Sequence, residues 1–184
     1  MPSIAQVIAG AQQIAASGGA FEPQRQANWF IQIVGLTGGA AAEDILAFSL
    51  ESGFLPNESN EEIEIQYANE RRYVAGKALF ETGSLVVKDF VDKGTADTVV
   101  KWRKTVYDQA TGKVGLAKEY KKNASIVLFG PEGSFKREWR LEGVWPQAVN
   151  YGTLDMTAND KVTIEITLRY DKAVPVIMTA SAAS

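Results

Sequence analysis

The sequence contains neither cysteine nor histidine. Without cysteine the chain can form no disulfide, has no thiol nucleophile and cannot build a sulfur-rich zinc site. Without histidine it lacks the commonest general base and the commonest metal ligand of proteins. A serine or threonine nucleophile would have only lysine or a carboxylate as its base, and no residue is singled out for that role. We therefore expect no cofactor, and an enzyme is the least supported class of function.

Long apolar runs and a strong excess of one charge are missing as well. No stretch approaches the roughly 18 apolar residues of a membrane span, and the apolar N-terminus carries no lysine or arginine before Arg25. We expect neither membrane insertion nor a secretory signal. The formal net charge of −3 argues against a dedicated nucleic-acid binder. The 184 residues, 46% of them hydrophobic, suffice for one domain with a buried core.

The spacing of apolar residues predicts mainly strands. The expected strands cover residues 29–36, 45–52, 61–68, 124–129, 135–144 and 161–170, with further β-favouring residues in 74–91. A single mid-chain helix is expected to begin at Thr95 as its N-cap and to end near Gly112. This order predicts an α+β, mostly β fold: a sandwich or barrel with one flanking helix.

The N-terminal segment has a helical spacing of its own. Ile4, Val7 and Ile8 recur at intervals that predict a short amphipathic helix over 3–16, ended by a pair of glycines. Such an arm could pack on its own domain or dock on a neighbouring copy, and both readings stay open. We divide the chain into a helical arm (1–20), a β domain (21–172) and a flexible or partner-ordered tail (173–184).

Two sequence features resemble catalytic or ligand-binding motifs. Glu62 and Glu64 share one face of an alternating strand with Gln66, and two carboxylates about 7 Å apart could hold a hard cation or act as an acid–base pair. No calcium-type pattern supports them, so a solvated strand face is favoured. The glycine-rich stretch 35–39 lacks the lysine of a phosphate-binding loop and is interpreted as a turn.

A Trp-Pro pair stands between two predicted strands. Pro146 cannot donate to a β-ladder, which places it at a strand end or edge, and it pushes Trp145 towards extended geometry. Gly143 permits unusual dihedral angles close by. We interpret this structural corner as a rigid bend that directs the last strand into a sheet shared with other copies.

These landmarks together resemble a known family. "SGGAFEPQRQANWFIQI" is followed by a tryptophan-bearing helix, a Gly-Lys-Val-Gly turn, Tyr-Lys before a strand, the Trp-Pro pair and a final alternating strand that ends in Tyr-Asp. Their order resembles that of tail tube proteins from contractile-tailed bacteriophages, over roughly residues 17–172. The same family is related to the tubes of injection machines and of type VI secretion.

The resemblance implies a structural protein. Its subunits would form hexameric rings whose strands join into one inner β-barrel, and the rings would stack into a tube in the virion, assembled in the host cytoplasm. The implied partners are other copies of the chain, the tail sheath protein, the tape measure protein, the baseplate hub and the tail terminator. DNA would pass through during ejection without specific binding, which suits a mildly acidic wall because basic walls hold phosphates.

Candidate residues follow from that implied role. The lumen would be lined by Glu62, Glu64 and Gln66, or by the polar face of the 161–170 strand; we favour the first. Phe54 and Leu55, in a predicted 53–60 loop, are candidates for contact with the next ring, unless they fold back on their own core. Ile4, Val7 and Ile8 of the arm are further candidates for the stacking contact.

Other functions remain as alternatives. The chain could form the tube of a contractile injection particle that carries no DNA, or a related baseplate ring. A monomeric ligand-binding β-barrel, from a different class, would require an enclosed apolar pocket and would not polymerise.

Overall fold

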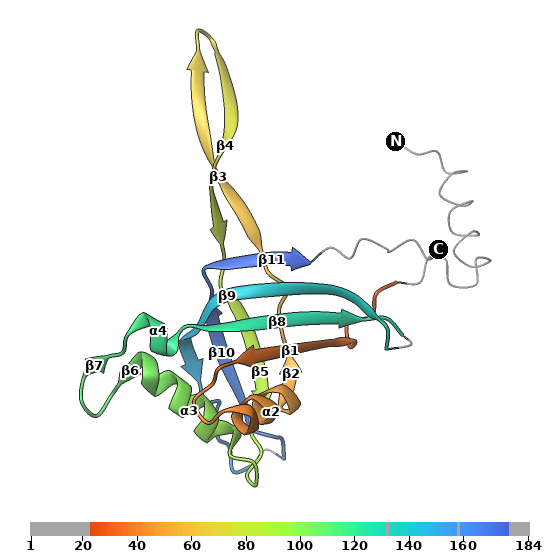
Figure 1. Cartoon of the computed structure of the whole chain (residues 1–184), viewed down its shortest axis with the longest axis vertical. Helices are drawn as coiled ribbons and strands as arrows, with labels where there is room; N and C mark the ends of the chain where they lie inside the picture. The colour runs from red at the N-terminus through yellow and green to blue at the C-terminus, as the bar shows by residue number, and fades with distance from the viewer. Residues whose placement is uncertain (1–22, 132, 158, 177–184) are drawn as a thin grey trace, which may run out of the picture.

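Two antiparallel sheets that share one long strand form the body of the protein (Figure 1). The computed structural model describes residues 23–131, 133–157 and 159–176. The first sheet has the order β1-β8-β9-β11, formed by Trp29–Val34, Lys122–Phe129, Phe135–Asn150 and Lys172–Val176. The second has the order β9-β10-β5-β2, where the added strands are Thr163–Arg169, Gly83–Lys88 and Leu50–Ser52. The mostly β fold predicted from the sequence is confirmed.

The core lies between the two sheets. Leu85 and Val87 of β5 and Ile166 of β10 are fully buried, and they meet Ile126 of β8 and Leu141 of β9 from the other sheet. The alternation predicted for the 161–170 strand is confirmed, because its apolar positions face this core. Burial of that face fixes the register of β10, since a slip by one residue would turn every apolar side chain outwards.

Within the described residues three helices flank the sheets, where the sequence pattern predicts only the mid-chain helix. They are α2 (Ala40–Phe48), α3 (Thr95–Val106) and the short α4 (Ala117–Tyr120). The predicted strand over 45–52 is therefore wrong in its first half, which is helical, and right only for β2. Three alanines directly after Gly39 favour a helix start, and Ala42, Leu46 and Ala47 bury one side of it.

The mid-chain helix α3 is confirmed but begins and ends differently from the expectation. Its N-cap is the left-handed Gly94, so Thr95 is the first helical residue and makes no capping bond. The Thr95 hydroxyl is instead buried, 3.0 Å from that of Ser49 at the end of α2. The helix stops at Val106, and the small strands β6 (Tyr107–Asp108) and β7 (Lys113–Val114) follow.

A long hairpin projects from the body (Figure 1). Its strands are β3 (Glu58–Tyr67) and β4 (Glu70–Phe80), so the predicted strand at 61–68 is confirmed and begins earlier than expected. The predicted 53–60 loop is correspondingly shorter. Among the strands that the structure describes, β3 and β4 pair only with each other. Only the base of the hairpin, at Phe80, packs against the core between the two sheets.

The predicted arm and the predicted tail lie at the two ends of the chain. The boundary drawn at residue 173 lies inside β11, which pairs with β9 as far as Val176. The predicted helix over 3–16, with Ile4, Val7 and Ile8, lies outside the described residues, as does the tail beyond 176. The division of the chain into arm, domain and tail stays a prediction.

Candidate assembly surfaces

The Gly143–Pro146 corner lies where β9 passes from one sheet to the other. Residues before it pair with β8 and β11, and Trp145 onwards pairs with β10. Pro146 lies inside β9, but among the described strands this half of β9 pairs only with β10 and forms the edge of the second sheet. The predicted edge position is therefore confirmed, and the alternative of a strand end is wrong. The ladder tolerates the proline because Leu168 pairs with Pro146 while Thr167 pairs with Ala148, which leaves Gln147 as an extra, bulged residue.

Packing holds this corner in place. Gly143 has a φ of 67°, and a Cβ there would collide with the carboxylate of Asp171. That carboxylate accepts hydrogen bonds from Lys121 Nζ at 2.7 and 2.8 Å. The Trp145 ring meets Tyr120 edge-on, with centroids 5.8 Å apart. Within one chain the bend joins the two sheets; its role in a sheet shared between copies stays a prediction.

The hairpin exposes an apolar row on one face. Ile63, Ile65 and Tyr67 of β3 are about half to three-quarters exposed, at 52%, 47% and 72%, and Val74 lies opposite Ile63. No described element covers these side chains. A row of this kind on an unsupported two-stranded ribbon is typical of a surface that becomes buried on assembly.

The other face of the hairpin is polar. It carries Glu62, Glu64 and Gln66, all exposed, and Glu64 Oε1 lies 3.3 Å from Arg71 Nε. Within the described part of the chain no cluster of acidic, cysteine or histidine residues could hold a metal ion. The favoured interpretation as a solvated strand face agrees with the exposure of this face, and its place in a lumen is untested.

The predicted contact residues Phe54 and Leu55 behave differently from each other. Phe54 is half-buried and stacks on Tyr170, with ring centroids 6.0 Å apart, directly above Gly83. Tyr170 also meets Phe80 at 6.1 Å, so this aromatic cluster fixes the base of the hairpin. Leu55 is 53% exposed. Of the two, only Leu55 could contact another copy of the chain without first leaving a packed position in its own core.

The outward face of the second sheet is the other polar surface singled out from the sequence. Glu165 and Arg169 of β10 are exposed there, and Ser84 Oγ donates a hydrogen bond of 2.7 Å to Glu165 Oε1. At the rim of the sheet Lys161 Nζ lies 2.7 Å from Glu51 Oε1, and this contact raises the pKa of Lys161. The face thus carries both signs of charge.

An apolar patch that the sequence pattern does not reveal lies at the end of the molecule opposite the hairpin (Figure 1). Phe48 of α2 is 80% exposed, and Val91 is 94% exposed in the turn before α3. Ile45, Phe48 and Phe90 line a cavity of about 400 Å³ here, with Asp44 and Lys93 at its edge. Phe48 falls inside the wrongly assigned strand, so a correct α2 would have shown it on an outer helix face. We call this surface the far-end patch.

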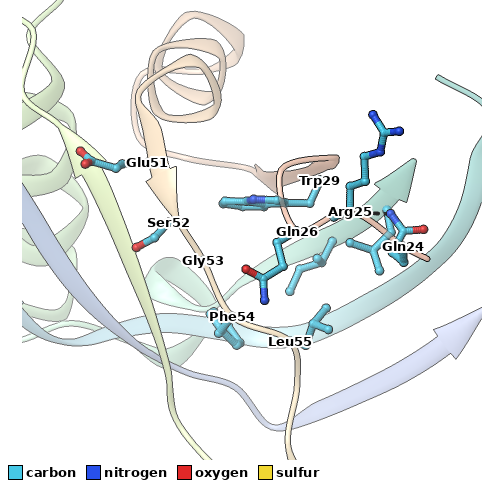
Figure 2. A pocket seen from close by; sticks show the side chains of 11 residues that line it. Gln24, Arg25, Gln26, Trp29, Glu51, Ser52, Gly53, Phe54 and Leu55 are labelled. Carbon is cyan, nitrogen blue, oxygen red and sulfur yellow. Dashed lines mark hydrogen bonds between the residues drawn. The ribbon is translucent and has the colours of Figure 1, made fainter. Parts of the chain in front are cut away.

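A larger cavity, of about 630 Å³, opens beside the first sheet (Figure 2). Trp29 of β1 contacts Gly53 of the 51–55 segment on one side of it, and Ile126 and Leu128 of β8 add apolar surface. Gln24, Arg25 and Gln26, just before β1, complete the lining.

Among the described helices none is long and apolar enough to cross a membrane.

The fold is shared with subunits of contractile injection systems. Over 97% of this chain and 100% of the other, the structure superposes with a TM-score of 0.66 and 17% identity on a chain of the sheath-tube complex of the extracellular contractile injection system PVC. A chain of the PVC sheath/tube terminator gives 0.67 over 86% of this chain and 99% of that one, at 17% identity. These similarities show that the chain shares the fold of those two chains.

Sequence comparison identifies the family. The family model of the T4-like virus tail tube protein gp19 matches residues 56–174, which is more than half of the chain. The tail tube protein of Serratia phage KSP90 is 24% identical over 156 residues, covering 82% of this chain and 88% of that protein. The chain belongs to the T4-like tail tube protein family, and its role is structural.

Proposed function

We propose that this chain forms hexameric rings that stack into the inner tube of a contractile phage tail and so provide the conduit for DNA ejection. The observation that carries the proposal is the β3–β4 hairpin, a long ribbon with an apolar row that nothing in the described chain covers. Isolated two-stranded ribbons are marginally stable in water, so a partner surface is required. Identical neighbours supply one in a polymer.

Unpaired sheet edges support the same conclusion. Strands β1 and β11 end the first sheet and β2 ends the second, and among the described strands each leaves one side of its backbone unpaired. Pairing between copies removes such edges in a closed barrel. The polar outer face of the second sheet, or the Glu62, Glu64 and Gln66 face of the hairpin, would line the lumen. Both faces carry carboxylates, which repel DNA phosphates and favour sliding.

Stacking requires two complementary surfaces at opposite ends of the subunit. The apolar row of the hairpin and the far-end patch around Phe48 meet this requirement. A contact between two different patches is heterologous, and when it does not close on itself it generates an open polymer. The stacking contact predicted at Phe54 is replaced in this proposal by the hairpin, because Phe54 packs on Tyr170 within its own chain.

The proposed partners follow from the place of the tube. The sheath would surround it, the tape measure protein would occupy it during assembly, and the baseplate hub and tail terminator would close its ends. Similarity to subunits from a sheath-tube complex and a tube terminator supports contacts of this kind. The tube would be part of the virion, assembled in the host cytoplasm. A tube of a particle without DNA is the second candidate, since those two solved structures come from an extracellular contractile injection system and not from a phage.

Negative-stain electron microscopy of the purified protein tests the proposal. We expect rings about one subunit high and tubes built from them. In the Ile65→Asp variant a charge enters the apolar row, so rings should persist while tubes are lost. Gln66→Asp adds the same charge on the opposite face and is the matched control, which should still form tubes. Single compact particles from the wild-type protein would refute the polymer, and normal tubes from Ile65→Asp would exclude the hairpin as the stacking surface.

A further inference from the structure

The 630 Å³ cavity beside the first sheet is largely apolar at its centre and open to solvent (Figure 2). Trp29 lies against Gly53 so closely that a Cβ at Gly53 would meet the indole at 2.6 Å. Leu55 is more than half exposed on the facing wall. A volume of this size is several times that of one aliphatic side chain, so the cavity can receive a short row of them.

The start of the described chain lies at this cavity. Gln24 and Arg25 line it, and Gln24 Nε2 donates a 2.7 Å hydrogen bond to the carbonyl of Phe129, which anchors the entry segment. Residues 1–22 precede that anchor. The linker 17–22 contains Gly18-Gly19, and its six residues can span at most about 20 Å. If residues 3–16 form the predicted helix, the end of that helix next to the linker must stay close to the cavity mouth.

The chemistry of that segment fits the cavity. Its predicted apolar face consists of Ile4, Val7 and Ile8, continued by smaller apolar residues, and its side chains carry no charge before Glu22. Burying it would therefore cost no desolvation of an ionised side chain. Glutamines on the rim, such as Gln24 and Gln26, could bond to the polar side of the same helix. A tether so short also gives the segment a high effective concentration at its own cavity.

We propose that residues 3–16 dock in the cavity of the same chain, with Ile4, Val7 and Ile8 against Trp29 and Leu55. The arm then covers the open side of the sandwich between β1 and the segment after β2. This assignment removes the arm from the ring-stacking surfaces and leaves the hairpin and the far-end patch for that role. It concerns a contact within one subunit and does not depend on tube formation.

Engineered cysteines test the docking, because the natural chain has none. In the full-length double variant Ile8→Cys with Leu55→Cys, mild oxidation should form a disulfide, which requires Cα atoms within about 7 Å. Non-reducing electrophoresis and peptide mass spectrometry should show it within single chains. Gln13→Cys with Leu55→Cys is the matched control: it places the thiol on the opposite helix face and should react at least about tenfold more slowly.

The outcomes separate the possible occupants. A cross-link within monomers, faster at Ile8 than at Gln13, supports docking in the same chain. Disulfide-linked dimers would assign the cavity to the arm of a second copy and overturn the proposal. Equal rates for the two variants, or no cross-link in protein whose circular dichroism matches the wild type, would overturn it as well. Dilution keeps the variants as monomers or single rings, so failure of tube assembly does not affect this readout.

Discussion

At the scale of single residues, the β9 corner depends on a glycine, because a Cβ at position 143 would collide with the Asp171 carboxylate. The glycine near the Trp-Pro pair is expected to permit unusual dihedral angles, and Gly143 does adopt a positive φ. Pro146 lies on the edge of the second sheet, as the rule for proline requires, but inside β9 and not at its end, because Gln147 bulges and lets the ladder continue around it. A bulge is set by the partner strand, here β10, and no local pattern in β9 records it.

Gly143→Ala should destabilise the protein by about 2 kcal/mol or more, because a left-handed φ is strained for alanine and the new Cβ displaces the Asp171 carboxylate from Lys121. Urea unfolding followed by fluorescence measures the change. Gly112→Ala is the matched control: Gly112 has a φ of 68°, but nothing lies within 4 Å of the position its Cβ would take, so only the backbone cost of about 1 kcal/mol remains. Equal losses in the two variants would show that the Asp171 contact is unimportant.

A hydrogen bond on the first sheet gives a prediction about pH. Ser125 Oγ donates a 2.7 Å bond to Glu138 Oε1, and this bond, with help from Arg140, holds the pKa of Glu138 below its ordinary value. A carboxyl with a lowered folded pKa stabilises the protein above its unfolded pKa, and this contribution is lost as the pH falls through the folded value. Ser125→Ala should therefore cost about 1 kcal/mol at pH 7 and clearly less near pH 3.

Thermal or urea unfolding of both proteins across that pH range measures the difference. Ser84→Ala is the control, since its hydroxyl bonds to Glu165 on an exposed surface where water competes. It should lose less stability at pH 7. A Ser125→Ala loss that stays constant from pH 7 to pH 3 would mean that packing, and not the charged form of Glu138, is responsible.

At the scale of elements, periodicity succeeds where one face is buried within the chain. β10 alternates between core and solvent, and α3 repeats its apolar residues along the side that buries Val99 and Trp102. It fails for α2, where Ile45 to Phe48 form an unbroken apolar run that fits a strand as well as a helix. The alanines before that run decide in favour of the helix, and the glycines before them form the turn from which it starts.

The hairpin shows a different limit. Its alternation correctly predicts a strand, yet neither face of that strand is buried. The alternation therefore distinguishes an apolar exposed face from a polar exposed face, and not a core face from a solvent face. Which of them faces a lumen, a neighbouring ring or solvent is decided by copies of the chain that the sequence pattern does not represent. Phe54 illustrates the converse: a loop phenylalanine interpreted as an interface residue completes the aromatic cluster with Tyr170 and Phe80.

At the scale of the whole molecule, the two uncovered apolar surfaces lie at opposite ends of the long axis (Figure 1). The hairpin row is one and the far-end patch is the other, and they differ in shape because one is a ribbon and the other a shallow cavity. A contact between the ribbon and the cavity joins two different surfaces. A polymer built from them has a direction, with hairpins free at one end and patches free at the other.

Mixing two assembly-defective variants tests this polarity. Ile65→Asp rings lack a working hairpin, and Phe48→Asp rings lack a working patch; Phe48 is 80% exposed, so its replacement should not disturb the core. Each variant alone should stop at single rings.

When preformed rings of the two variants are mixed, the hairpins of the Phe48→Asp ring can still enter the patches of the Ile65→Asp ring. Stacks of two rings should therefore form. They should grow no further, because their outer ends carry only the defective surfaces. Electron microscopy and sedimentation count the rings per stack. Longer stacks in the mixture, or none at all, would contradict a head-to-tail contact between these two surfaces.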